Sequence, residues 1–257
     1  MEGPVISIKA ETLFHIGSFA VTNSLLLAFI TFVLFVLFAL VLRPKISMIP
    51  GKLQNLFESI ADMLLGIMES VFGSRRAAEQ YFPLIATIFL FVMISNWLGL
   101  MPGVGSLGIH GMHDGHEAFI PLFRAPAADL NFTIAIAIVS VLATNIFGIL
   151  AIGFVKHFKK FFNAQKPFPI FSFVGILEFI SEFVKIISFS FRLFGNVFAG
   201  EVLLIIIAFL MPYLLPLPFL FLELFVGFIQ AFIFSMLTMV FIGMSVVDHG
   251  EHEVAHG

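Results

Sequence analysis

The sequence SFSFRLFGNVFAGE spans residues 188–201 and places an arginine, an asparagine and a glutamate in one of the most apolar parts of the chain. It lies within residues 171–210, which contain no proline. A helix of that length is about 60 Å long, twice the hydrocarbon thickness of a membrane. Such a helix must tilt strongly, lie flat or bend, and Gly195 and Gly200 are positions where it can bend. Placing an arginine within lipid costs roughly 3 kcal/mol or more of insertion free energy. We therefore expect Arg192 to be functional or paired with another group.

The composition is that of an integral membrane protein. The 257 residues are 60% hydrophobic, include 36 Phe and have a mean hydropathy of +1.10. Only 11% are charged, against about a quarter in soluble domains. The chain has no cysteine, which excludes disulfides and cysteine metal sites. No basic patch supports binding of nucleic acid. The N-terminus lacks the basic region of a cleaved signal peptide, so we expect it to be retained.

Five apolar runs predict an all-α membrane protein with five membrane-embedded helices in a single domain. The runs cover residues 19–42, 82–101, 132–155, 171–210 and 219–247. Each of the first three fits the roughly 30 Å of hydrocarbon. The last two are longer and are separated by Pro212, Pro216 and Pro218. We therefore expect the last two helices to form a strongly tilted hairpin.

Residues 50–72 predict an amphipathic helix on the membrane surface. Apolar side chains recur at helical spacing from Leu53 to Ile67, with Glu58 and Asp62 between them. A helix packed on a soluble partner is the alternative. An N-terminal outer segment, a polar outer loop and a polar tail are predicted at residues 1–18, 103–129 and 248–257.

The distribution of basic residues predicts the orientation in the membrane. If the runs alternate across the bilayer, nine Lys and Arg residues fall on one side and only Lys9 and Arg124 on the other. Loops rich in Lys and Arg stay in the cytoplasm. We therefore expect the N-terminus outside and the C-terminus in the cytoplasm.

Polar side chains form a stripe along the helix predicted over residues 171–210. The stripe contains Glu178, Ser181, Lys185, Ser188, Arg192 and Asn196. At 100° per residue, these six residues share one face of the helix. Glu201 lies nine residues after Arg192, about 180° around the helix. On the last helix, Glu223 and Gln230 share a face.

Two interpretations of these buried polar residues are open. In the first, they only join helices: Glu201 or Glu223 neutralises Arg192, and Lys185 pairs with one of the two glutamates that precede it on the same helix. In the second, the opposite faces of Arg192 and Glu201 mark two separate polar routes, one from each side of the membrane. Carboxylates within a membrane are suited to relaying protons along such routes.

The chain resembles subunit a of bacterial-type F-type ATP synthases over nearly its whole length. The resemblance is carried by NWLGLMP at residues 96–102, AADLN at 127–131, RLFGNVFAGE at 192–201 and QAFIF at 230–234. The arginine motif followed by a Gln-Ala-Phe sequence on the hairpin partner is highly specific.

The resemblance implies a proton-translocating stator subunit of the membrane sector, without catalysis of its own. It implies two offset half-channels facing a rotating ring of c subunits, so that proton flow is coupled to ATP synthesis or hydrolysis. Arg192 matches the essential arginine, whose fixed charge separates the half-channels. The residues that match the outer half-channel are Asn196, Glu201, Glu223 and Gln230. Those that match the inner half-channel are Glu178, Ser181 and Ser188, and Asp129 is a further candidate.

The same resemblance implies the surroundings of the protein. Its partners are the ring of c subunits, the b subunits of the peripheral stalk and the rest of the ATP synthase complex. Its location is the lipid bilayer of a bacterial inner membrane. We expect no cofactor and no bound metal.

Three other functions are compatible with parts of the sequence. The loop with His110, His113 and His116 also contains acidic residues and can bind Zn²⁺ or Cu²⁺, but it lacks helical spacing, and a solvated loop is the alternative. A secondary transporter, with Arg192 binding an anionic substrate, calls for paired half-repeats that the sequence does not show. A membrane scaffold without transport leaves the opposite faces of Arg192 and Glu201 unexplained.

Overall fold

The computed structural model describes residues 7–42, 51–101, 103–105, 107–113, 116–159 and 170–246. Five helices in these ranges are long and apolar enough to cross a membrane. They are α1 (Asn23–Leu42), α3 (Arg75–Gly99), α4 (Leu130–Ile152), α6 (Ile170–Leu210) and α7 (Pro216–Val246). The predicted all-α membrane fold is therefore confirmed.

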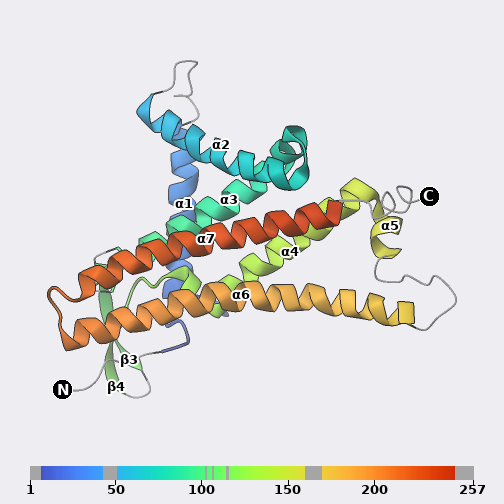
Figure 1. The fold of residues 1–257 in the computed structure, drawn as a ribbon. Coiled ribbons are helices and arrows are strands. Elements are labelled where there is room, and N and C mark those ends of the chain that lie inside the picture. Colours follow the sequence, from blue (N-terminus) through green and yellow to red (C-terminus); the bar gives the residue numbers. More distant parts are fainter. Residues whose placement is uncertain are drawn as a thin grey trace, which may run out of the picture.

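The last two helices form a long hairpin. α6 and α7 lie side by side and cross α1 at a steep angle, with α3 and α4 packed against them (Figure 1). α6 has 41 residues and runs without a break, so neither Gly195 nor Gly200 interrupts it. Because α6 is far longer than the membrane is thick, its steep angle to α1 matches the strong tilt expected from the sequence.

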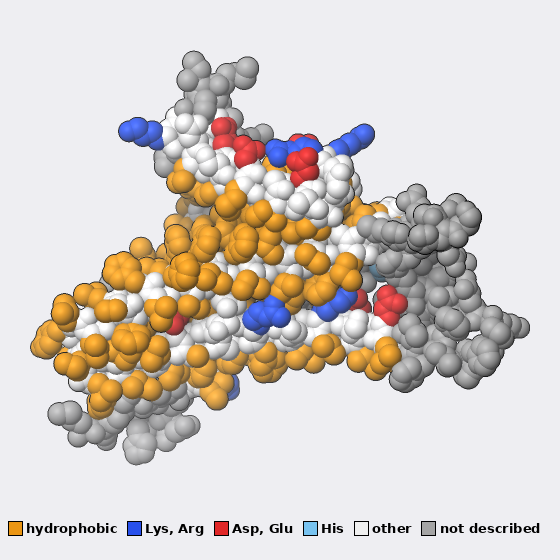
Figure 2. All heavy atoms as spheres, viewed as in Figure 1, with side chains coloured by type: hydrophobic (Ala, Val, Ile, Leu, Met, Phe, Trp, Pro, Cys, Tyr) orange, Lys and Arg blue, Asp and Glu red, His pale blue; other side chains and the backbone are white. Residues whose placement is uncertain are grey.

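The amphipathic surface helix is also present, as α2 (Lys52–Phe72). Charged side chains gather over its outward face (Figure 2), whereas Leu64 and Met68 on the opposite face are buried. Gly73 ends the helix with a φ of 72°, and its N–H donates to the Glu69 carbonyl. This conformation favours glycine and closes the helix with a capping hydrogen bond.

Close packing and buried hydroxyl groups hold the helices together. Ala137 and Ala231 are fully buried, which lets neighbouring helices approach closely. The Ser140 and Thr238 hydroxyl groups lie 2.7 Å apart and join α4 to α7. Phe89 of α3 packs edge-on against aromatic rings of α7.

Helix boundaries differ from the sequence prediction at several points. α7 begins at Pro216, so Pro216 and Pro218, which were expected between the last two helices, belong to its first turn. α3 begins at Arg75 rather than at residue 82, because the Ser74 side chain accepts a hydrogen bond from the Ala77 N–H and caps the helix. The predicted run 132–155 is divided at Gly153, whose φ of 87° ends α4. The short helix α5 (Phe154–Lys159) follows.

Two β-hairpins flank the helices, and the sequence analysis predicted neither. β1 (Thr12–Ile16) pairs with β2 (Phe19–Thr22), so the first apolar run begins as a strand. β3 (Gly108–His113) pairs with β4 (His116–Pro121) within the predicted outer loop. The short 3-10 helix η2 (Pro126–Ala128) then leads into α4. The predicted polar tail, residues 248–257, lies outside the described residues.

Candidate functional site

A cavity of about 320 Å³ lies between α3, α6, α7 and the chain that precedes η2. Its polar lining residues are Asn96, Arg124, Glu201 and Glu223, and Gly99 and Gly227 are among its small ones. Two carboxylates, one from each helix of the hairpin, therefore reach the same space. Asn196 and Gln230, which were grouped with them in the sequence analysis, do not line it.

Glu201 forms an ion pair with Arg124. The Arg124 Nε lies 3.1 Å from Glu201 Oε1 and 3.2 Å from Oε2. The Arg124 side chain is only 7% exposed and that of Glu201 27%. Arg124 was not among the site residues predicted from the sequence, although it is one of only two basic residues on the predicted outer side. That isolation was the signal that could have identified it.

Glu223 is buried in α7 against the backbone of α6. A Cβ at Gly200 would come within 2.0 Å of Glu223 Oε2, so the carboxylate occupies the space that glycine leaves. Two hydrogen bonds fix α7 to α3 nearby. The Asn96 Nδ2 donates to the Gly227 carbonyl at 3.2 Å, and the Trp97 Nε1 donates to the Leu224 carbonyl at 3.0 Å.

Arg192 lies on an exposed face of α6. None of the ion pairs found among the described residues includes it. Its Nη2 lies 3.4 Å from the Ser188 Oγ, and its backbone carbonyl accepts a hydrogen bond from Asn196 Nδ2 at 2.9 Å. Glu201 pairs with Arg124 and not with Arg192, so one of the neutralising contacts considered from the sequence is not made.

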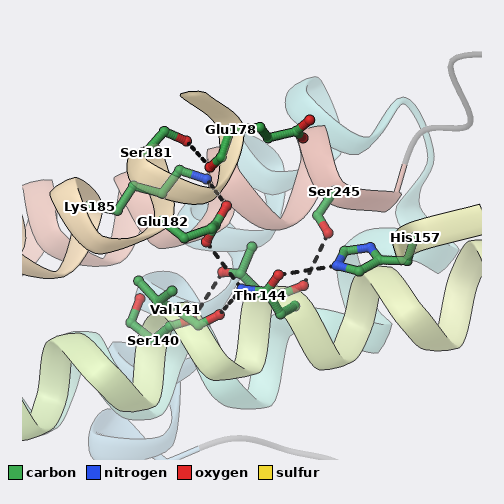
Figure 3. A network of polar contacts seen from close by, with 10 residues as sticks. Ser140, Val141, Thr144, His157, Glu178, Ser181, Glu182, Lys185 and Ser245 are labelled. Atoms are coloured by element: carbon green, nitrogen blue, oxygen red, sulfur yellow. Dashed lines mark hydrogen bonds and ion pairs between the residues drawn. The ribbon is translucent and has the colours of Figure 1, made fainter. Parts of the chain in front are cut away.

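A second polar network lies at the other end of α6 and joins three helices (Figure 3). Glu182 pairs with Lys185 on the same helix. The Asn145 Nδ2 of α4 donates to Glu182 Oε2 at 3.1 Å. The Nε2 of His157, a residue buried in α5, lies 3.1 Å from Asn145 Oδ1. Because an amide oxygen can only accept, the His157 N–H is the donor. A continuous chain of hydrogen bonds therefore runs from α5 to α6.

The sequence-predicted inner residues lie beside this network. The Ser181 Oγ donates to the Glu178 carbonyl at 2.9 Å, and the Glu178 side chain points away from Glu182 (Figure 3). Lys185 is held by Glu182 and by the Phe241 ring, whose centre lies 4.8 Å from its Nζ. One of the two pairings foreseen for Lys185 is thus observed.

Asp129 occupies the N-cap position of α4. Its side chain accepts a hydrogen bond from the Asn131 N–H at 2.9 Å and one from the Asn131 Nδ2 at 3.2 Å. Both partners are local, so the contacts of Asp129 are those of a helix cap.

The hypothesis of a metal site in the histidine-containing loop depends on the side chains of residues 110–119. These side chains are not among those that the structure describes. Among the residues that the structure describes, no group of three or more His, Asp or Glu side chains could hold a metal ion.

The fold and these networks define a class: membrane proteins with several spans that keep charged and amide side chains within an apolar helical bundle. The family described as ATP synthase A chain matches residues 24–243. The chain therefore belongs to this family, as the sequence resemblance implied, and is a proton-translocating subunit of the membrane sector of ATP synthase.

Individual relatives support this assignment. ATP synthase subunit a of Campylobacter jejuni is 36% identical over 204 residues, which cover 79% of this chain and 81% of the relative. The subunit a of Gloeobacter violaceus is 36% identical over 208 residues, or 81% of this chain and 77% of the relative. That of Moorella thermoacetica is 30% identical over 242 residues, or 94% and 99% of the two chains.

Proposed function

We propose that the chain supplies two offset half-channels to a rotating ring of c subunits and that Arg192 separates them. The proposal rests on one observation: two charged residues of α6, Arg192 and Glu201, lie in different surroundings. Arg192 lies on an exposed face of α6. Glu201, nine residues further on, lines the cavity between α3, α6 and α7. A charge on the open face is available to a partner, whereas a charge in a cavity is available to protons from one side.

The cavity is the inner part of the outer half-channel. Protons that reach it bind Glu201 and Glu223, since buried carboxylates are groups that relay protons in membranes. From there a proton passes to a carboxylate of the ring, with Asn196 and Gln230 as polar groups on the way. Gly227 lines this space, and Gly200 leaves room for the Glu223 carboxylate beside it.

Arg192 acts as a fixed positive charge. A guanidinium stays protonated under all physiological conditions. The Ser188 contact at 3.4 Å is long for a hydrogen bond, so donors of Arg192 are available to a ring carboxylate. The charge favours the ionised carboxylate as it passes, and it prevents protons from leaking directly between the half-channels.

The inner half-channel begins at the other end of α6. Glu178, Ser181 and Ser188 remain its candidates from the sequence. The hydrogen-bonded chain of His157, Asn145 and Glu182 adds a second set of groups. Histidine exchanges protons near neutral pH, which suits a group on a route of release.

The proposal extends to the surroundings of the chain. The ring of c subunits faces Arg192, and b subunits of a peripheral stalk hold the protein against rotation. The subunit is not catalytic itself. It lies in a bacterial inner membrane with the N-terminus outside and the C-terminus in the cytoplasm. Lys52, Arg75 and Arg76 support this orientation, since they gather at the α2 end of the molecule.

Replacement of Arg192 tests the mechanism. In membrane vesicles, Arg192→Ala and Arg192→Lys are expected to abolish proton-driven ATP synthesis while the complex still assembles. Lysine keeps a charge but loses the planar group with its several donors. Arg76→Ala, at an exposed arginine outside both networks, is the control and keeps activity. Near-normal synthesis by Arg192→Ala would overturn the proposed mechanism.

A further inference from the structure

Arg124 is a buried charge to which the proposed mechanism gives no role. It lies between β4 and η2, with a side chain that is 7% exposed. Its three nitrogen atoms are all engaged. Nε contacts Glu201, Nη2 donates to the Ser7 carbonyl at 2.9 Å, and Nη1 donates to the Lys9 carbonyl at 3.1 Å. The guanidinium therefore joins α6 to the N-terminal segment formed by residues 7–9.

The backbone around Arg124 is also fixed. Ala125 packs against Gly99 of α3 so closely that a Cβ at residue 99 would come within 2.5 Å of the Ala125 Cβ. The ring of Phe198, one turn before Glu201 on α6, lies 5.8 Å from the guanidinium carbon. With its Nη atoms held by residues 7–9, the side chain presents its Nε to Glu201.

We propose that Arg124 is a positioning residue for proton uptake, which holds the Glu201 carboxylate at the wall of the outer cavity and favours its ionised form. The N-terminal segment at residues 7–9 supports the guanidinium in this position. This inference rests on the proposed function of Glu201 as a group of the outer half-channel.

The charges around Glu201 give the direction of the effect. Arg124 is the basic group that contacts it, from the chain before η2. Glu11, just before β1, is close enough to repel it, and Glu223 of α7 lines the same cavity. Without Arg124, Glu201 keeps two acidic neighbours and loses its positive partner. Because a positive partner favours the charged form of a carboxylate, its loss is expected to make the ionised form of Glu201 less favourable in the variant than in the unmodified protein.

The test is the dependence of ATP synthesis on the pH of the outer side. In inverted vesicles that side is the lumen, which is equilibrated at a series of pH values while the total driving force is kept constant with a potassium diffusion potential. Arg124→Gln is expected to shift the half-maximal luminal pH upward by about one unit or more. It also lowers the maximal rate, because the proton leaves Glu201 more slowly.

Arg124→Lys keeps the positive charge. Its half-maximal luminal pH is therefore expected to lie much closer to that of the unmodified protein than that of Arg124→Gln does. Arg75→Gln is the matched control, since the ion pairs of Arg75 with Asp62 and Glu79 are solvent-exposed. It leaves the midpoint unchanged. If both Arg124 variants reduce the assembled complex equally and leave the midpoint in place, Arg124 only ties the N-terminal segment, and the inference is overturned.

Two further variants keep the test decisive. If Arg124→Gln does not assemble, Glu201→Asp withdraws the carboxylate from an intact Arg124 and is expected to raise the midpoint. Free aspartate is slightly more acidic than glutamate, so a rise reflects the lost contact, and an unchanged midpoint contradicts the inference. Glu201→Gln separates the two proposals. If it leaves the pH dependence intact, the outer route through Glu201 fails. If it alters the dependence while Arg124→Gln does not, only the role of Arg124 fails.

Discussion

The carboxylate of Glu223 in α7 lies directly against the α-carbon of Gly200 in α6. A Cβ at residue 200 would come within 2.0 Å of Glu223 Oε2 and 2.1 Å of its Cδ. Oxygen and carbon atoms of separate side chains cannot approach so closely, so the position of the acid depends on the missing side chain opposite it. Gly200 thus leaves the space that the Glu223 carboxylate occupies beside the cavity.

The first prediction follows from this contact. Gly200→Ala pushes the Glu223 carboxylate out of its place, and a displacement of about 1 Å in a reacting group can reduce a rate by roughly 100-fold. We expect ATP-driven proton pumping, measured by dye quenching in vesicles, to fall by about 10- to 100-fold. Gly66→Ala in α2 is the control, since nothing lies within 4 Å of a Cβ there. Equal pumping by the two variants would show that Glu223 can move without consequence.

The second prediction concerns Asp129, where the structure shows a helix cap and the family resemblance implies proton translocation. Asp129→Asn retains an oxygen that accepts from the Asn131 N–H, so we expect assembly and proton flux close to normal. Asp129→Ala loses the cap, which costs about 1 kcal/mol, and we expect less assembled complex on thermal challenge. A strong loss of flux in a fully assembled Asp129→Asn complex would instead place the carboxylate on the proton route.

The third prediction tests the inner network. Asn145→Leu removes the amide that joins His157 to Glu182. If this chain conducts protons, flux per assembled complex falls several-fold, because the hydrogen-bonded connection between His157 and Glu182 is broken. Asn55→Leu, at an exposed position in α2, is the control. Normal flux with reduced assembly would show that the network only holds the helices together.

Much of the fold could be predicted because its signals are local. The length and hydropathy of each run define a membrane helix, and a helix of 41 residues cannot stand upright in a bilayer of about 30 Å. The opposite faces of Arg192 and Glu201 follow from helical geometry alone. The β-hairpins were missed, since strands of four to six residues carry only a weak pattern of alternation, and β2 also lies within an apolar run that was read as helix.

The partners of the charged residues could not be predicted in the same way. Arg124 and Glu201 are 77 residues apart in the chain, and nothing in either segment specifies the other. Gly200 was considered as a point of bending, whereas in the folded protein it provides space for Glu223. Both features depend on how α6 packs against its neighbours, which a single sequence does not contain.

The unbroken course of α6 has a consequence for the length of this segment. Glu182 and Glu201 belong to one rigid helix, so nineteen residues at 1.5 Å each set the two networks about 28 Å apart. One inserted or deleted residue between them would rotate one end relative to the other by about 100°. That rotation would separate Glu182 from α4 or Glu201 from Arg124. A substitution between Glu182 and Glu201 can change a single contact. A change in the number of residues between them would disturb the contacts at one end or the other, so the length of this segment is fixed by both networks together.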